Sequence, residues 1–449
     1  MEINADLHAH SAYAGGARGS SSKNLDEKSL KRFSDLATNS PLKGVNLLGT
    51  GDCQFKPWLN FLNENLVEDE NGIFKYKDLQ QSETAPKYVL QTEVILTGPV
   101  PNSKKKKKAH LLFYFPNFTI VDEFNDLLDK FKINHQKMAR PFVVTDTVAE
   151  VETKLNAFLD LDKGVEMVPA HIMTPEGVFG SNTRINYLDE LFGNVAKRIH
   201  AIETGLSADP SILGLIPELD SLSLISNADA HSGALNRVAR EFTTFNLNKL
   251  SYSTLISAIR TNKIVRTAEF HPTEGRYFLT GHRAKRKMPG VHLANQFCYF
   301  SPKNVPENDL CPICDKEMSV GVLQRALEVS KIQGGNRKIG DGPQRSFVTM
   351  VPLIEVIGAT LGISTLTSKK VLGIYQDIID VIGTEINLWS DLRSVDKLKN
   401  SSLNQDLVEN IIQIQSGNFC FVPGGYDGVY GKLRIGETLD FQDVSVISI

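Results

Sequence analysis

Apolar runs of strand length alternate with segments of helical periodicity through the first half of the chain. The runs lie at 2–7, 44–49, 88–93, 109–113, 166–170 and 222–226. Apolar positions at helical spacing lie between them, at 25–38, 148–161 and 187–197. Alternating β and α units predict an α/β domain in which the loops after the strands lie at one face.

Side chains that bind metal ions stand at or near the ends of most of these runs. Neighbouring side chains of a strand point to opposite faces, so His8 and His10 share one face, where two imidazoles can bind one ion. Later runs carry Asp52, Glu93, His110, His171, Asp229 and His231, of which only His110 stands at the start of its run. Any single one fits an ordinary turn residue equally well, but the whole set favours a metal cluster at one rim of an α/β barrel.

Length and composition place the chain among ordinary globular proteins. Its 449 residues predict two or three domains, and 41% hydrophobic with 22% charged residues is enough to form cores.

No apolar run reaches the roughly 18 residues that span a bilayer, so we expect no membrane partner. The chain begins directly with a strand-like run, so we expect no secretory signal. Five cysteines, an odd number, argue against a disulfide framework and favour a reducing cytoplasm.

The formal net charge of −3 does not by itself indicate nucleic-acid binding, but basic residues are unevenly distributed. Residues 261–345 contain fourteen Lys and Arg against eight Asp and Glu. This basic region fits either a solvated surface or a surface that follows a phosphate backbone. Five consecutive lysines, Lys104 to Lys108, predict a solvated loop, with DNA steering as the alternative.

Several motifs resemble known families. Those that are similar to the polymerase and histidinol phosphatase (PHP) domain are ADLHAHS at 5–11, GTGD at 49–52, Glu93, PAH at 169–171 and SNADAHS at 226–232. Others resemble endonuclease Q, in the same order over nearly the whole chain: GTGD, AIETGLSADP at 201–210, GHR at 281–283, CPICDKEMSVGVL at 311–323 and PGGYDGVYGKLRI at 423–435. The resemblance implies an α/β fold with a distorted seven-stranded (β/α) PHP barrel. It also implies an enzyme that cuts DNA on the 5′ side of deaminated bases and abasic sites.

The resemblance also implies how the ligands divide among two or three divalent ions (Zn, Mg or Mn). His8, His10, Glu93 and Asp229 would hold the first ion, His110 and His171 would join a bridging Glu93 at the second, and Asp52 and His231 would remain for the third. Asp229, Glu93 and His231 would be the catalytic residues. A glycine- and serine-rich loop at 15–23 has no histidine, and Asp52 stands where many relatives carry histidine, so the third ion would have fewer ligands. Glu203 is a candidate substrate-binding residue, which either orients the metal ligands from behind or caps the next turn.

A second metal site is predicted further along the chain. Cys311 and Cys314 form a Cys-x-x-Cys turn typical of structural zinc, although a redox motif has the same spacing. Cys298 is expected as the third ligand, and His282 and His292 are the alternatives for a fourth. The loop that carries Tyr426 is a candidate for binding the damaged base, by the same resemblance.

We therefore expect a PHP metallo-phosphoesterase barrel at 1–248, a linker with a zinc-binding module at 249–344, and a helical DNA-binding domain with a β tail at 345–449. The predicted function is a DNA repair endonuclease that hydrolyses the bond 5′ to uracil, hypoxanthine, xanthine or an abasic site by metal-activated water. Two alternatives are a PHP phosphoesterase for a small phosphorylated metabolite and a non-catalytic DNA-binding accessory protein. Some members of the family work with a replication sliding clamp, but no clamp-binding box is recognisable near 443–449.

Overall fold

The computed structural model describes residues 1–14, 25–79, 82–101, 103–137, 139–284, 292–293, 295–391 and 393–448. The predicted glycine- and serine-rich loop at 15–23 lies outside the described residues.

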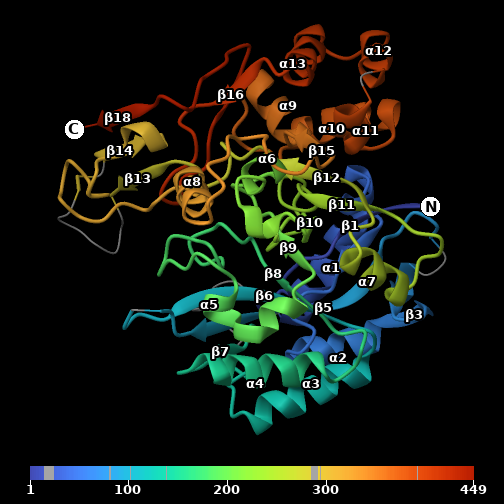
Figure 1. Ribbon diagram of the computed structural model, residues 1–449. Helices are drawn as coiled ribbons and strands as arrows, with labels where there is room; N and C mark the ends of the chain where they lie inside the picture. Colours follow the sequence, from blue (N-terminus) through green and yellow to red (C-terminus); the bar gives the residue numbers. More distant parts are fainter. Residues whose placement is uncertain are drawn as a thin grey trace.

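A mixed sheet of eleven strands runs through the described part of the chain (Figure 1). Its strands are β1 (Glu2–Asp6), β2 (Leu47–Gly49), β3 (Leu66–Glu70), β4 (Ile73–Tyr76), β5 (Lys87–Gly98), β6 (Lys107–Phe115), β7 (Phe142–Val144), β8 (Glu166–Pro169), β11 (Phe242–Asn246), β12 (Ile264–Phe270) and β15 (Phe347–Met350). β2 lies between β1 and β5 and pairs in parallel with both. The pairs β1–β11 and β5–β6 are antiparallel. The predicted α/β class is confirmed, and the sheet mixes both pairing directions.

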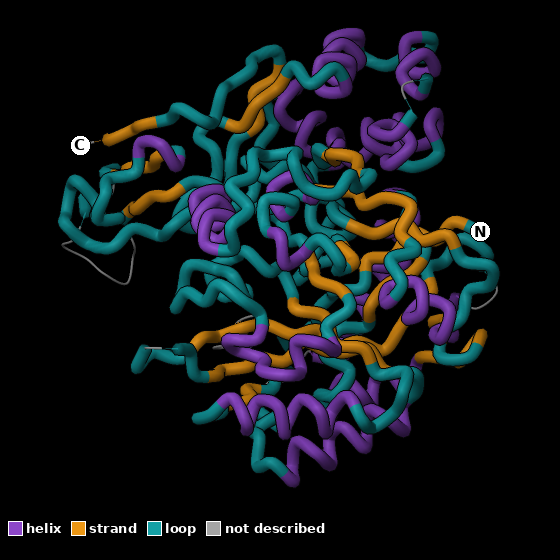
Figure 2. Tube along the Cα trace, viewed as in Figure 1, coloured by secondary structure: helices purple, strands orange, loops and turns teal. Residues whose placement is uncertain are grey.

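Helices cover the sheet of this first part. They are α1 (Leu25–Lys43), α2 (Lys56–Asn65), α3 (Phe118–Lys130), α4 (Val148–Leu159), α5 (Asp189–Phe192), α6 (Pro210–Leu213) and α7 (Tyr252–Arg260). In α3, Phe124 and Leu128 stand four residues apart on one helical face and are fully buried. The helix begins where the Asn117 side chain accepts a hydrogen bond from the Ile120 N–H. Figure 2 shows the strands between α2–α4 on one side and the helices of the C-terminal part on the other.

Two short parallel strands, β9 (Ala201–Glu203) and β10 (Ser223–Ile225), lie beside the main sheet. The Ile172 N–H, after β8, donates to the Glu203 carbonyl at 3.1 Å. The His10 N–H, after β1, donates to the Ala230 carbonyl at 3.1 Å. These bonds bring the ends of β1, β8, β9 and β10 together, and this is where most of the predicted metal ligands stand.

The C-terminal part contains a small sheet and a group of helices. β13 (Thr280–Arg283), β14 (Phe297–Phe300) and β18 (Ser445–Ser448) pair antiparallel, near α8 (Val322–Ile332). The helices are α9 (Leu353–Leu361), α10 (Lys369–Ile382), α11 (Glu385–Ser390), α12 (Ser394–Lys399) and α13 (Gln405–Gln415), followed by the antiparallel pair β16 (Phe419–Phe421) and β17 (Leu433–Ile435). The end of the chain therefore returns to the cysteine-containing region, which no local pattern indicated.

A buried ion pair fixes these helices against the first part of the chain. Lys43 Nζ, at the end of α1, lies 2.8 Å from Glu385 Oε1, and neither side chain is exposed. The second carboxylate oxygen of Glu385 accepts from the Tyr375 hydroxyl at 2.8 Å, and the Leu353 N–H donates to Oε1 at 3.0 Å. This full set of partners offsets the cost of burying two charges.

The main sheet continues beyond residue 248. β12 pairs with β11, and β15 pairs in parallel with β12, so strands from all three predicted domains share one sheet. The predicted boundaries at 248/249 and 344/345 stay predictions. No helix in the described ranges is long and apolar enough to cross a membrane.

Candidate active site

His8 and His10 follow β1 and point into one cluster, as their spacing predicts. His10 Nε2 lies 3.1 Å from Asp229 Oδ1 and 3.5 Å from Glu93 Oε2. His8 Nε2 lies 3.5 Å from the same Asp229 oxygen and 3.8 Å from Glu93 Oε1. His8, His10 and Asp229 thus form a group whose ligand atoms can share one metal ion.

A second such group consists of Glu93, His110 and His171. Glu93 and His110 stand in the middle of β5 and β6, and not at strand ends as most of the predicted ligands do. Their register places Ile95 opposite His110, so Glu93 is its diagonal neighbour on the same face of the sheet. His110 Nδ1 lies 2.7 Å and His171 Nε2 lies 3.5 Å from Glu93 Oε1. Glu93 therefore lies between the two groups, where a bridging carboxylate must lie.

Hydrogen bonds at Nδ1 set the tautomers of the cluster histidines. His8 Nδ1 donates to Glu203, with its two oxygens at 2.9 and 3.1 Å. His171 Nδ1 donates to Thr174 Oγ1 at 2.7 Å, because that hydroxyl donates its own proton to the His171 carbonyl. His10 Nδ1 lies 3.2 Å from Asp52 Oδ1. When a ring is neutral, this leaves its Nε2 with a lone pair directed into the cluster, which is the form that binds a metal ion.

Several atoms of the cluster are buried without a hydrogen-bond partner, and they are the atoms that a metal ion would need. They are His8 Nε2, His10 Nε2, His110 Nε2 and Asp229 Oδ1. Their remaining contacts are of the ion-pair kind, such as His10 Nε2 to Asp229 Oδ1 at 3.1 Å and His110 Nε2 to Glu176 Oε2 at 3.4 Å. Buried polar atoms are normally paired, so an unpaired set that converges on one point fits bound cations. The donor set of imidazole and carboxylate suits Zn, Mn or Mg.

The backbone at this site is strained. Asp52, His171 and Asp229 all have positive φ, at 44°, 29° and 47°, a region that residues with a side chain seldom adopt. Gly205 has φ +79°, and a Cβ there would lie 2.5 Å from the His171 Cβ. Strained backbone of this kind persists only where the packing around it fixes the conformation. Such residues are concentrated at functional sites.

The histidines and carboxylates of the cluster shift one another's pKa. Burial alone would lower the pKa of His8 and His10, but the carboxylates around them raise it to about 9 and about 10. Burial would raise the pKa of Glu93 and Asp229, but the histidines hold it below its usual range. Each charge is thus stabilised by its opposite, and the site favours added cations.

The two residues predicted to hold a third ion, Asp52 and His231, differ in burial and in hydrogen bonding. Both Asp52 oxygens are engaged, one by His10 Nδ1 and the other by the backbone N–H and hydroxyl of Ser11 at 2.8 and 2.7 Å. His231 has a 41% exposed side chain, with Nδ1 3.4 Å from Asp229 Oδ1.

Arg140, which no sequence pattern indicated, reaches the cluster with Nη1 3.0 Å from Glu93 Oε2.

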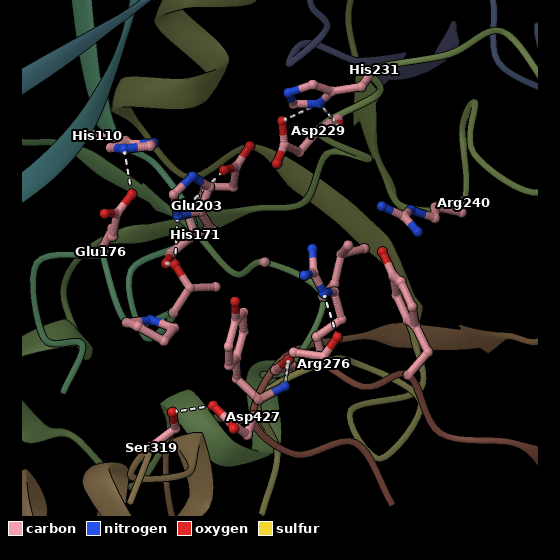
Figure 3. A pocket seen from close by; sticks show the side chains of 18 of the residues that line it. His110, His171, Glu176, Glu203, Asp229, His231, Arg240, Arg276, Ser319 and Asp427 are labelled. Atoms are coloured by element: carbon pink, nitrogen blue, oxygen red, sulfur yellow. Dashed lines mark hydrogen bonds and ion pairs between the residues drawn. The ribbon is translucent and has the colours of Figure 1, made fainter. Parts of the chain in front are cut away.

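The cluster opens into a cavity of about 870 Å³. Figure 3 shows His110, His171, Asp229 and His231 on one side of this cavity and Arg240 and Arg276 across from them. The arginines of this side come from the loop after Asp229, from the segment before β13 and from β13 itself. The loop between β16 and β17 adds Asp427, Gly428 and Tyr430. A metal centre therefore faces a basic wall across a space large enough for a nucleotide-sized group.

Two solved structures are similar to the chain over nearly its whole length. The lesion-specific endonuclease PfuEndoQ from Pyrococcus furiosus has a TM-score of 0.73 and 26% identity, over 97% of this chain and 96% of that one. An endonuclease Q in complex with a 27-mer duplex substrate, with an abasic lesion at the active site, has a TM-score of 0.75 and 26% identity over 97% of both chains. The chain is thus similar to endonuclease Q over nearly its whole length. Its mixed α/β architecture matches the endonuclease Q fold.

Two further relatives of the chain are uncharacterized proteins. YqxK of Bacillus subtilis is 25% identical over 445 residues, which is 96% of this chain and 99% of YqxK. MJ0043 of Methanocaldococcus jannaschii is 28% identical over 250 residues, which is 55% of this chain but only 29% of MJ0043. No protein-family model matches the chain.

The second predicted metal site of this endonuclease Q homologue is a compact cluster of cysteines and histidines. Its ligand atoms from His282, His292, Cys311 and Cys314 lie within 4.8 Å of one another. Cys298 lies beside this group, with Sγ 3.5 Å from Cys311 Sγ and 3.8 Å from Met318 Sδ, but it does not belong to it. The two histidines expected as alternatives thus complete a four-ligand set without Cys298.

The two candidate substrate-binding residues, Glu203 and Tyr426, have different surroundings. Glu203 is buried and holds His8, the His171 N–H at 2.7 Å and the Asn227 amide at 2.8 Å, which suits an orienting role. The Tyr426 ring is 5% exposed and packs on Tyr299, with centroids 4.7 Å apart. Tyr426 does not line the cavity, whereas its neighbours Asp427, Gly428 and Tyr430 do.

Proposed function

We propose that this protein is a DNA repair endonuclease that hydrolyses the phosphodiester bond 5′ to deaminated bases (uracil, hypoxanthine, xanthine) and abasic sites, leaving 3′-hydroxyl and 5′-phosphate ends. The observation that carries the proposal is the convergence of unpaired imidazole and carboxylate atoms on one rim of a nucleotide-sized cavity. Support comes from the whole-length similarity to an endonuclease Q whose structure holds a duplex with an abasic lesion at the active site.

The metal ligands are proposed residue by residue. His8, His10, Glu93 and Asp229 hold one divalent ion, and His110 and His171 share Glu93 at a second. When bound, such ions supply an activated water for attack on phosphorus and positive charge beside the leaving oxygen. Asp229 and Glu93 lie closest to that chemistry.

The neighbouring residues orient these ligands. Glu203 and Thr174 fix the tautomers of His8 and His171. Asp52 orients His10, because both of its oxygens are already engaged. A third ion at Asp52 and His231 stays a prediction, with His231 as its most accessible ligand.

The remaining parts of the chain have supporting roles in this proposal. We assign seven strands, β1, β2, β5, β6, β8, β9 and β10, to a barrel of the PHP type. Its metal centre lies among residues that follow β1, β8 and β10 and residues inside β5 and β6. The cluster at Cys311 holds a structural zinc ion. An enzyme that acts on a damaged base must take the nucleotide out of the stack, and the cavity between the barrel and the loop at 427–430 can receive it. A sliding clamp and a cytoplasmic location stay predictions.

The proposal is tested with labelled duplexes that carry one uracil, hypoxanthine, xanthine or abasic site, or no lesion, with and without EDTA. We expect nicking only 5′ to the lesion and only without EDTA. Nicking that is absent from every duplex, together with hydrolysis of a small phosphomonoester, would favour the metabolite phosphoesterase instead. Lesion-specific binding without hydrolysis of either substrate would favour the accessory protein.

A further inference from the structure

The cavity wall opposite the metal centre is formed by arginines that the proposed hydrolysis does not use. Arg237, Arg240 and Arg276 all line it, with Tyr430 among them. Figure 3 shows Arg240 and Arg276 with their side chains directed to the same space as Asp229 and His231. Three guanidinium groups in one cavity repel one another, so their convergence needs a reason.

Arg240 is the buried member of this wall. It is only 5% exposed, and its Nε and Nη2 both donate to the Ala228 carbonyl at 3.4 Å, one residue before the metal ligand Asp229. Its Nη1 is buried and has no hydrogen-bond partner. A guanidinium carries five donors and stays charged, so a buried unpaired nitrogen marks the place of a missing acceptor.

Arg237 and Arg276 are held by the ring of Tyr430. Their guanidinium carbons lie 5.0 and 5.5 Å from its centroid. Burial would raise the pKa of Tyr430, but the positive charges of Arg240 and Arg237 outweigh it and lower that pKa below its ordinary value. The ring therefore positions two guanidinium groups without neutralising them.

A glycine turn keeps Arg276 at the cavity. Arg276 Nε donates to the Gly428 carbonyl at 3.2 Å, and the Gly428 N–H donates to the Arg276 carbonyl at 3.0 Å. Gly428 has φ +85°, and a Cβ there would meet Arg276 Nη2 at 3.5 Å. The turn thus uses backbone carbonyls, and not carboxylates, to hold the arginine.

The charge of this wall is not balanced by acidic side chains. Within the described residues, none of Arg237, Arg240 and Arg276 forms an ion pair with a carboxylate. Glu241 and Glu274 lie near enough to interact with Arg240, and burial raises the pKa of both well above the ordinary value, which favours their neutral forms. Three guanidinium groups without a carboxylate ion pair in the described part of the chain therefore face the cavity, which Asp427 also lines.

We propose that Arg237, Arg240 and Arg276 bind the DNA phosphate on the 3′ side of the lesion nucleotide, while the scissile phosphate on its 5′ side lies at the metal centre. This inference rests on the proposed function. A nucleotide turned out of the stack carries both of its phosphates with it, and the cavity has two walls that attract anions, one through cations and one through guanidinium groups. The planar forks of arginine match phosphate oxygens in pairs. The wall thus positions the lesion nucleotide by its backbone, whatever base it carries.

The first test measures binding by fluorescence anisotropy with the full-length protein as purified. The duplex carries one abasic site, and a methylene group replaces the 3′ oxygen of the scissile bond, which prevents cleavage and keeps the charge. Arg237→Ala and Arg276→Ala should each raise Kd roughly tenfold or more. In the double variant, the slope of log K against log salt should fall by about one, as expected for one lost phosphate contact.

The matched control is Arg198→Ala. Arg198 pairs with Asp160 at 2.8 Å beyond the end of α4 and does not line the cavity, so its Kd and salt slope should equal those of the wild type. Thermal melts verify that the variants fold. Arg276 is exposed, so its replacement should leave the melting temperature unchanged.

The second test replaces single phosphates by uncharged methylphosphonates. Neutralising the phosphate 3′ to the lesion should weaken binding by the wild type, and Arg276→Ala should then cause no further loss, because both changes remove the same contact. Neutralising the phosphate next to the scissile one on its 5′ side should leave the effect of Arg276→Ala intact.

The outcomes separate this inference from the proposed function. Wild-type protein that nicks lesion duplexes, while the double variant keeps the wild-type Kd and salt slope, would overturn the arginine wall and leave the proposed function standing. Arginine-dependent binding without any nicking would overturn the proposed function and keep the wall. Additive losses from the 3′ methylphosphonate and Arg276→Ala would overturn the assignment of that phosphate.

Discussion

The two metal-ligand clusters of this chain are built in opposite ways. The ligands of the active-site cluster stand between His8 and Asp229, on separate strands and loops that the main sheet brings together. The cysteine and histidine cluster comes from one stretch, His282 to Cys314, around β13, β14 and a single turn. The first depends on the whole fold. The ligands of the second come from one short stretch, although its strand β14 pairs with β18 at the end of the chain.

The clusters differ as well in what surrounds them. The active-site cluster contains carboxylates, and three of its ligands, His110, His171 and Asp229, line the cavity. The other cluster has four nitrogen and sulfur ligands, and none of them lines that cavity. A complete tetrahedral set without an open position is typical of structural zinc, and an open, oxygen-containing set is typical of hydrolysis. One cluster should therefore control rate and the other stability.

The largest effect is expected for Asp229→Asn. This change removes the charge that lies 3.5 Å from His8 Nε2 and 3.1 Å from His10 Nε2, so ions bind weakly and the nicking rate should fall by on the order of 10³-fold or more. Single-turnover nicking of an abasic duplex measures the rate, and elemental analysis measures the metal content. The ion of the cysteine cluster should remain bound.

Asp129→Asn is the matched control for this prediction. Asp129 also contacts a histidine, with Oδ1 3.0 Å from His135 Nε2, but this pair does not line the cavity. Its nicking rate should stay within about twofold of the wild type. Equal loss in both variants would mean that the cluster at Asp229 is not the site of hydrolysis.

Cys311→Ser should have the next largest effect, and on stability. The Cys311 side chain is buried between His292 Nε2 at 3.2 Å and Cys298 Sγ, so its loss removes a ligand from a closed site. We expect one fewer zinc per chain and a melting temperature lower by at least roughly 5 °C. At a temperature where the variant stays folded, its nicking rate should be close to that of the wild type. Normal zinc content would contradict the assignment.

Glu203→Gln should have a smaller effect, confined to the active-site cluster. The glutamine amide could still accept a hydrogen bond, but the change removes the negative charge that fixes His8 and raises its pKa. Loss of such an outer partner lowers metal affinity by roughly 10–100-fold. Titration of apo protein with Mn²⁺ measures this affinity, and excess Mn²⁺ should restore most of the nicking rate.

Glu166→Gln provides the comparison for Glu203→Gln. Glu166 is a buried carboxylate that also contacts a histidine, with Oε1 3.0 Å from His200 Nδ1, but it lies outside both metal groups. The variant should lower the free energy of unfolding and leave Mn²⁺ affinity unchanged. Failure of Glu203→Gln to shift that affinity relative to Glu166→Gln would remove Glu203 from the orienting role.

Local sequence pattern is enough to predict one part of the active site. His8 and His10 share a face because a strand alternates, and the Cys311 turn follows from its spacing. Glu93 and His110 stand in the middle of long strands and meet through the register of β5 and β6. The strand-like runs and the family resemblance named both residues as ligands, but no local pattern contains the register that brings them together.

Charge patterns were the least reliable guide. Lys107, within the lysine run expected to be a solvated loop, is buried at the start of β6 and donates to the Gly180 and Asn182 carbonyls at 2.9 Å. Burial lowers its pKa to about 7. Conversely, Arg140 and Arg240 reach the active site from loops, and nothing in their sequence neighbourhood distinguishes them from surface arginines. Such long-range placements depend on the tertiary fold.

The smallest effect is expected for Cys298→Ser, and it tests whether the closed cluster has the ligand set that the structure indicates. Cys298 was expected as the third zinc ligand, yet the four-ligand group contains His282 and His292 in its place. Cys298→Ser should therefore retain zinc and lose only the packing of a buried sulfur on Met318, about 1 kcal/mol. His292→Ala should release zinc. The reverse result, with zinc lost from Cys298→Ser and retained in His292→Ala, would restore the set expected from the sequence.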